Sequence, residues 1–154
     1  MSVYLLHRFS RPGRVLRELD RLGEPPARYG WMRFLRAKLW LHLRRDYAVA
    51  EAEFARAARA APGLMMARAY MAETSLCRGR EARAWGVIDA AVARYGGRAG
   101  VEARAWRGAM RLWTGRYEEA LADLTPTAAA GARFARAWRG GALAQLGRLE
   151  EAER

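Results

Sequence analysis

The small and apolar residues of this chain follow a helical rhythm that repeats along the sequence. Three segments align without gaps: residues 67–80 (ARAYMAETSLCRGR), 103–116 (ARAWRGAMRLWTGR) and 135–148 (ARAWRGGALAQLGR). Each ends in Gly-Arg and is followed by an amphipathic stretch that contains alanine. No segment shows the alternation of apolar and polar residues that is typical of a strand. The pattern predicts pairs of helices joined by tight turns at glycine.

The turn glycines are spaced as in helical repeat proteins. Gly79, Gly115 and Gly147 lie 36 and 32 residues apart, and a less regular copy ends at Arg45, 34 residues before Gly79. Repeats of this length are typical of helical hairpins that stack on one another. We therefore predict an all-α fold in the form of an α-solenoid.

Small residues recur where the two helices of a hairpin are expected to cross closely. These positions are Ala50, Ala84, Ala120 and Ala152 in the second helices and Gly108 and Gly140 in the first helices. A glycine inside a helix costs about 0.5–1 kcal/mol relative to alanine, so its recurrence indicates a packing requirement. Pro126 falls within a second helix, where it predicts a shortened or kinked helix.

The repeat resembles the tetratricopeptide repeat, a family with units of about 34 residues. The first unit, residues 31–64, has matching residues at the family's signature offsets: Phe34, Leu41, Asp46, Tyr47, Ala50, Phe54, Ala57 and Pro62. Two further full units span residues 65–98 and 101–132, and a truncated fourth spans residues 133–154. The resemblance implies a right-handed α-solenoid of helix–turn–helix units over residues 31–154.

The two ends of the chain depart from the repeat. Within residues 1–30, Ser10 is a candidate N-cap for an apolar series that ends before Gly23, so we expect one capping helix over about residues 10–22. Residues 149–154 begin a second helix but supply less than two turns of it. The chain is therefore expected to be part of a longer protein or to pack its open end on another chain.

The chain is strongly basic, with 28 Lys and Arg residues against 16 Asp and Glu residues and a net charge of +12. Lys38 is the single lysine and asparagine is absent, which is typical of a GC-rich bacterial genome. Genomic bias and a selected polyanion-binding surface therefore explain the charge about equally well. Residues 1–45 carry a net +8, and residues 46–154 carry +4. The candidate polyanion contacts are Arg11, Arg14, Arg17, Arg33 and Arg36.

Catalytic and cofactor-binding motifs are absent from the sequence. It lacks a dinucleotide-binding glycine motif, a Walker-type motif and a Gly-x-Ser-x-Gly motif. One cysteine and two histidines do not make a zinc cluster. Cys77 lies beside Arg78 and Arg80, which are expected to lower its pKa, but no general base accompanies it. We therefore expect no enzymatic activity, no cofactor and no metal.

The family resemblance also implies a binding groove, because fixed offsets of the first helices line the concave surface in tetratricopeptide proteins. Carried onto this sequence, the partner-binding residues are Met32, Leu35, Arg36, Leu39, His42, Met66, Tyr70, Glu73, Trp106, Leu112, Trp113, Phe134 and Trp138. This set is apolar and aromatic, which suits a peptide or a partner helix. As an alternative, Tyr70, Trp106 and Trp138 pack between neighbouring repeats.

The sequence thus favours a non-catalytic protein–protein interaction module, or scaffold, that binds a peptide or partner helix. The alternatives are an arginine-rich nucleic-acid-binding or regulatory subunit and the repeat portion of a larger enzyme whose catalytic domain lies outside this chain. Residues 31–45 are apolar and basic, but their apolar side chains fall on two opposite faces, which disfavours a membrane-surface helix. Without a membrane-spanning stretch or a secretion signal, a cytoplasmic location is expected.

Overall fold

The structure, a computed structural model, describes residues 17, 21 and 29–152. These residues form helices and no strand, which confirms the all-α prediction. The capping helix expected at about residues 10–22 lies outside the described residues, except for Arg17 and Arg21, which are helical and exposed. The last two residues, 153 and 154, also lie outside them. The chain divides into two compact units, residues 1–81 and 82–154.

In the first unit, the helices of the described residues enclose an aromatic and alanine-rich core. Helix α3 (Gly30–Leu39) continues into a π-helical turn, η1 (Trp40–Arg44), and is followed by α4 (Tyr47–Ala60) and α5 (Met65–Cys77). Helix α4 packs against both α3 and α5. The buried residues of this core are Phe34, Ala37, Leu41, Ala50, Phe54, Ala57, Ala58 and Ala67. Alanines let the helices approach closely, and the phenylalanines fill the remaining space.

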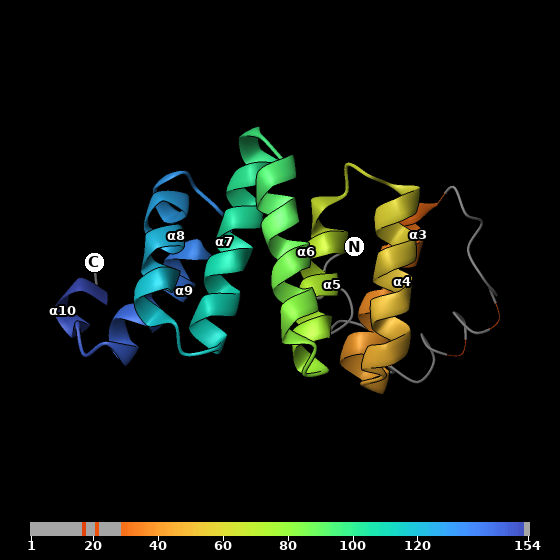
Figure 1. Ribbon diagram of the computed structural model, residues 1–154, viewed down its shortest axis with the longest axis horizontal. Helices are drawn as coiled ribbons and strands as arrows, with labels where there is room; N and C mark the ends of the chain where they lie inside the picture. Colours follow the sequence, from red (N-terminus) through yellow and green to blue (C-terminus); the bar gives the residue numbers. More distant parts are fainter. Residues whose placement is uncertain (1–16, 18–20, 22–28, 153–154) are drawn as a thin grey trace. The chain divides into compact units, whose positions relative to one another are not determined.

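The second unit contains α6 (Glu81–Arg94), α7 (Gly97–Trp113), α8 (Tyr117–Ala129), α9 (Ala135–Gln145) and α10 (Leu149–Ala152) (Figure 1). Helix α7 packs against both α8 and α9, α8 packs against α9, and α10 packs against α9. Ala120, Leu124 and Leu143 are fully or almost fully buried in the shared core.

The turns after α5, α7 and α9 have the same geometry, and it explains their glycines. Gly79, Gly115 and Gly147 have φ angles of 68°, 78° and 73°, a left-handed conformation that costs a side chain about 1–2 kcal/mol. The N–H group after each glycine donates to the carbonyl five residues earlier, at 2.8–2.9 Å.

The less regular copy of this turn, after η1, contains Arg45, which has a φ of 53° and is the one non-glycine with positive φ in the described residues. Here the N–H of Asp46 reaches back six residues, to the carbonyl of Trp40, because the π-helical turn adds one residue. The Asp46 side chain then accepts a hydrogen bond from the N–H of Val49 at 3.0 Å and caps α4.

The packing requirement predicted for small residues is confirmed at Gly108 but not at Gly140. A Cβ atom on Gly108 would lie 2.7 Å from Cγ of Leu124, so α7 and α8 meet too closely there for a side chain. A Cβ atom on Gly140 would make only an ordinary contact of 3.7 Å with the carbonyl oxygen of Ala152. Ala50, Ala84 and Ala120 are completely buried, as their expected positions between helices require.

Pro126 does not end α8, which runs three residues beyond it and is only one residue shorter than α4 or α6. A proline at this position has no N–H group to donate to the carbonyl of Ala122. That carbonyl instead accepts a hydrogen bond from Nη2 of Arg104 at 3.2 Å. The arginine therefore replaces the missing helical bond from the neighbouring helix, and the predicted shortening does not occur.

Candidate partner-binding site

Four of the predicted groove residues form one aromatic cluster on α7 and α9 of the second unit. The centre of the Trp138 ring lies 5.4 Å from that of Trp106, 6.2 Å from that of Trp113 and 5.6 Å from that of Phe134. The two tryptophan pairs meet edge to face, a favourable geometry for aromatic rings. We call Trp106, Trp113, Phe134 and Trp138 the aromatic cluster.

The aromatic cluster has a buried base and an exposed rim. Trp106 is only 6% exposed, whereas Trp113 and Phe134 are 47% and 48% exposed. Trp138 packs against the core of the unit, as does Leu112, another predicted groove residue. Gly141 lies beside Leu112, since a Cβ atom there would make an ordinary contact of 3.5 Å with its Cδ2 atom. The exposed rings are thus held by neighbours that are fixed in the core.

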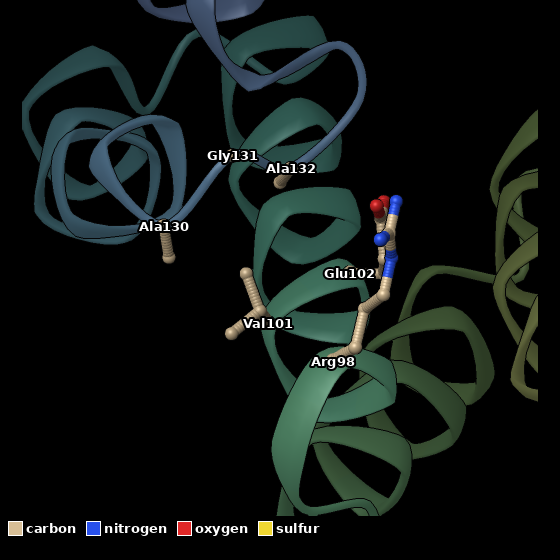
Figure 2. Close-up of a pocket in the computed structure, with 6 residues that line it drawn as sticks. All are labelled: Arg98, Val101, Glu102, Ala130, Gly131 and Ala132. Atoms are coloured by element: carbon tan, nitrogen blue, oxygen red, sulfur yellow. The ribbon is translucent and has the colours of Figure 1, made fainter.

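A charged hollow of about 320 Å³ lies farther toward the N-terminal end of α7 (Figure 2). It is lined by Arg98, Val101, Glu102, Ala130, Gly131 and Ala132. Figure 2 shows the Arg98 and Glu102 side chains extending together from α7, whereas Val101 lies on the side of Ala130. Glu102 is one helical turn before Trp106, so the hollow and the aromatic cluster share a face of α7.

The turn between α8 and α9 connects this hollow to the aromatic cluster. Oε1 of Glu102 accepts a hydrogen bond from the backbone N–H of Arg133 at 3.3 Å, and the Arg133 guanidinium lies 5.3 Å from the centre of the Phe134 ring. The surface therefore offers aromatic rings for apolar contact and, beside them, both signs of charge.

The predicted groove residues of the first unit have varied surroundings. Met32 and His42 are exposed, Leu39 is buried, and Leu35, Arg36, Met66, Tyr70 and Glu73 are partly buried. The Tyr70 ring stacks on Phe54 at 5.4 Å and meets Phe34 edge-on at 5.5 Å. Tyr70 thus packs against neighbouring helices, which was the alternative considered for it, and the buried Trp106 does the same in the second unit.

The single lysine was not among the predicted site residues, yet it lies in an unusual place. Lys38 is buried, with Nζ 5.1 Å from the centre of the Tyr70 ring and 5.8 Å from that of Phe34. Burial raises the pKa of Glu73 to about 7, although the charge of Lys38 opposes this rise. The pKa of His42 is lowered by partial desolvation from surrounding groups, although its side chain is exposed by surface area, and by the charge of Lys38. These shifts reflect packing of the first unit around charged groups.

Cys77 is not activated by its neighbouring arginines, contrary to the expected lowering of its pKa. Partial burial and the Glu73 carboxylate, one helical turn earlier, raise the pKa of the thiol. Arg78 and Arg80 instead form ion pairs with the buried Glu51, which also accepts a hydrogen bond from Ser75 at 2.8 Å. A nucleophilic role for Cys77 therefore has no support in the geometry.

Several arginines bind buried carboxylates, a role that the composition alone does not reveal. Asp123 of α8 accepts hydrogen bonds at 2.7–2.9 Å from Arg104, Arg107 and Arg111 of α7. Burial disfavours the ionised form, but hydrogen bonds from Arg107 and Arg104 and the charges of Arg107 and Arg111 hold the pKa of Asp123 below its ordinary value. The spacing of these arginines on one face of α7 is the sequence signal that predicts a shared partner.

The candidate polyanion contacts fall into three groups. Arg33 is buried, with Nη1 3.6 Å from Oε2 of Glu53, so little of its side chain faces solvent. Arg36 is partly buried and Arg17 is exposed. Arg11 and Arg14 lie outside the described residues.

The described residues contain no cluster of His, Cys, Asp and Glu side chains that could hold a metal ion. None of the helices in this part of the chain combines the length and apolar character needed to cross a membrane. Comparisons of the chain with protein-family models, with curated proteins and with solved structures found no match.

Proposed function

We propose that this chain is a non-catalytic binding module of the tetratricopeptide type, in which the aromatic cluster binds apolar side chains of a partner protein. The fold implied by this proposal is a right-handed solenoid of helical hairpins. Its support is the recurrence of one turn geometry at Gly79, Gly115 and Gly147, at spacings near 34 residues. The packing of α7 against both α8 and α9 is also what stacked hairpins require.

The observation that carries the binding proposal is the half-exposed state of Trp113 and Phe134. Leaving two large rings in water forgoes a favourable burial of about 1.5–3 kcal/mol for each fully buried aromatic side chain. The core-packed Trp138 contacts both rings and itself packs against the buried Trp106, so little side-chain freedom remains to be lost on binding. Rigid aromatic residues beside a charged rim are typical of the energetic centre of a protein interface.

The geometry favours a partner segment that presents apolar side chains on one face. Such a segment, helical or extended, buries its apolar face on Trp113 and Phe134. Arg98, Glu102 and Arg133 then lie at the margin of the interface, where charges contribute more to orientation and association rate than to affinity.

The test is quantitative affinity purification with the full chain and two variants. The double variant Trp113→Ala/Phe134→Ala removes the exposed rim, and Trp31→Ala is the matched control, because Trp31 is 49% exposed but lies on α3. We expect the double variant to weaken retention of a specific partner at least about tenfold while the control retains it. Thermal unfolding followed by circular dichroism verifies that all three proteins are folded.

Equal retention of every bound protein by the double variant and the wild type would contradict the proposal. So would loss of the same proteins from the Trp31→Ala control, because it would indicate nonspecific adhesion to exposed aromatic residues.

A further inference from the structure

The surface that contains the aromatic cluster carries charge toward one end of α7 and aromatic rings toward the other. Arg98, Glu102, Trp106 and Trp113 follow one another in this helix at intervals of four, four and seven residues, so helical periodicity puts them on one face. Arg98 and Trp113 are the exposed ends of this series, and the helical rise separates them by about 22 Å. A partner segment that lies along this face therefore meets both kinds of group.

Two guanidinium groups of this surface form no ion pair with a carboxylate of the described residues. Arg98 is exposed and borders the hollow beside α7. Arg133 is also exposed, and its guanidinium lies 5.3 Å from the centre of the Phe134 ring. Each of these arginines can therefore donate hydrogen bonds to a carboxylate of a partner without giving up such an ion pair.

Among the residues that line the hollow, Glu102 supplies the one carboxylate, and this group already has a contact within the chain. Its Oε1 atom accepts a hydrogen bond from the backbone N–H of Arg133 at 3.3 Å, at the turn between α8 and α9. Helix α8 ends and α9 begins at this turn, so the partial charges of the two helix ends are opposite in sign and lie close together. The charged side chains therefore dominate here, and the exposed arginines are the groups that face a partner.

We propose that the partner segment carries an acidic side chain that binds Arg98 or Arg133, beside apolar side chains that bind Trp113 and Phe134. This inference rests on the function proposed above and adds the chemistry of the partner. A carboxylate forms charge-assisted hydrogen bonds with a guanidinium group, whereas a lysine or arginine at the same place is repelled by it. The acidic side chain also sets the direction of the segment, because charge and rings lie toward different ends of the face.

A peptide fits this arrangement of charges better than a nucleic-acid strand does. Glu102 lies between Arg98 and the tryptophans on the same face of α7. A nucleic-acid strand along this face has a phosphate at every nucleotide and would bring negative charge next to Glu102. A peptide can place one carboxylate at an arginine and uncharged residues beside Glu102.

The test is selection from a library of random peptides displayed on phage, with the full chain as bait. Peptides of about 12 residues are long enough, because an extended chain of that length covers more than the separation of Arg98 and Trp113. We expect the wild type to select sequences that combine leucine or aromatic residues with Asp or Glu. Changing the acidic residue of a selected synthetic peptide to lysine is expected to weaken its binding about tenfold.

Charge reversal separates this local preference from the basic character of the whole chain. Arg98→Glu/Arg133→Glu is expected to select Lys or Arg in place of Asp or Glu, while the apolar residues of the selected sequences persist. Arg59→Glu/Arg136→Glu is the matched control, because it changes the net charge equally at two exposed arginines. Arg59 belongs to the first unit, and Arg136 precedes Trp138 by two residues and so faces nearly the opposite side of α9. This control should select as the wild type does.

The possible outcomes distinguish this inference from the proposed function. Selected sequences that share apolar residues without an acidic preference, or whose acidic preference persists in Arg98→Glu/Arg133→Glu, overturn the inference and leave the proposed function in place. A wild-type chain that selects no recurring sequence also overturns the inference, and the affinity purification described above then decides the proposed function alone.

Two further outcomes contradict both. One is an unchanged selection by Trp113→Ala/Phe134→Ala, since the rings would then bind no apolar side chain. The other is a single-stranded oligonucleotide that displaces the selected peptide and itself loses affinity in Arg98→Glu/Arg133→Glu, since the surface would then belong to a nucleic-acid site.

Discussion

Among single residues, Glu73 shows that the predicted groove residues of the first unit include a carboxyl group in surroundings unlike an ordinary solvated surface. It lies one turn after Tyr70 on α5, and its carboxyl group is affected by the buried Lys38 and in turn affects Cys77. Burial raises the pKa of Glu73 from an ordinary 4.5 to about 7 because the charged form loses hydration that Lys38 does not replace. The folded chain therefore holds this proton over a range in which the unfolded chain has released it.

This difference makes stability depend on pH with a defined sign. The stabilising contribution of the protonated carboxyl group is fully present below pH 4.5 and is lost as the pH rises to about 7. Glu73→Gln removes the titrating group and is expected to be more stable than the wild type by about 2–3 kcal/mol at pH 8, with a much smaller difference at pH 4.5.

Urea unfolding followed by circular dichroism at the two pH values measures this difference. The control is Glu118→Gln, which makes the same chemical change at an exposed position in the first turn of α8. A Glu73→Gln variant whose stability parallels that of the wild type at both pH values would contradict the assignment.

At the scale of helices, the glycines Gly86 and Gly108 have opposite roles although both lie inside α-helices. Gly108 allows α7 to approach Leu124 of α8, whereas no atom lies within 4 Å of the position of a Cβ atom on Gly86 in α6. Packing against Leu124 therefore requires a glycine at position 108. At Gly86 no packing contact offsets the intrinsic helix-destabilising effect of glycine.

Alanine substitutions separate these two roles. Gly108→Ala is expected to destabilise the protein by about 1–3 kcal/mol, because the new methyl group would displace Leu124. Gly86→Ala is expected to stabilise it by about 0.5–1 kcal/mol through helix propensity. Denaturant unfolding measures both changes, and equal effects of the two substitutions would show that α7 and α8 do not meet closely at Gly108.

Helices and turns follow from the sequence to a greater extent than side-chain partners do. The turns at Gly79, Gly115 and Gly147 depend on local backbone geometry, so their glycines predict them. The carbonyl of Ala122, which has no N–H donor at Pro126, is instead bonded by Arg104 from another helix. No local sequence pattern therefore reveals that α8 continues through Pro126. The π-helical turn before Arg45 depends on one additional residue in a helix that must still meet α4.

The candidate site, like the fold, could be predicted from the sequence only in part. The predicted groove positions Trp106 and Trp113 are seven residues apart in α7, and helical periodicity alone puts them on the same face of that helix. Periodicity does not reveal that Leu39 is buried while Trp113 is half exposed, since exposure depends on how neighbouring helices pack. The effect of Glu73 on Cys77 was accessible from their spacing of four residues, but the pairing of Arg78 with Glu51 was not.

At the scale of the whole molecule, each of the arginine–carboxylate contacts described above joins residues of the same compact unit. Asp123 and its three arginines all belong to the second unit, whereas Glu51 and Glu53 with their arginines belong to the first. In helical repeat proteins stability is close to a sum over units and their nearest neighbours. The net charge of +12 thus includes arginines that fix helices to one another.

Asp123→Asn tests whether the loss of such a contact destabilises mainly the unit that contains it. It leaves Arg104, Arg107 and Arg111 without their buried carboxylate and is expected to cost about 3–5 kcal/mol. Hydrogen exchange measured by mass spectrometry should show faster exchange in α7, α8 and α9, with smaller changes in α3, α4 and α5.

Asp89→Asn is the matched control for this substitution, because Asp89 is exposed and contacts only Arg107 of this group, so it should cost less than about 1 kcal/mol. Uniformly faster exchange in both units of Asp123→Asn would indicate that the chain unfolds as one cooperative body instead.

The burial of Lys38 has a consequence for chemical labelling and for covalent regulation. It is the one lysine of the chain, and its ammonium group lies against the rings of Tyr70 and Phe34. Acylating reagents that target primary amines should therefore react only slowly with Lys38 in the folded chain. Acetylation of Lys38 would require its ammonium group to leave the rings of Tyr70 and Phe34, which makes acylation of this lysine a chemical measure of local opening.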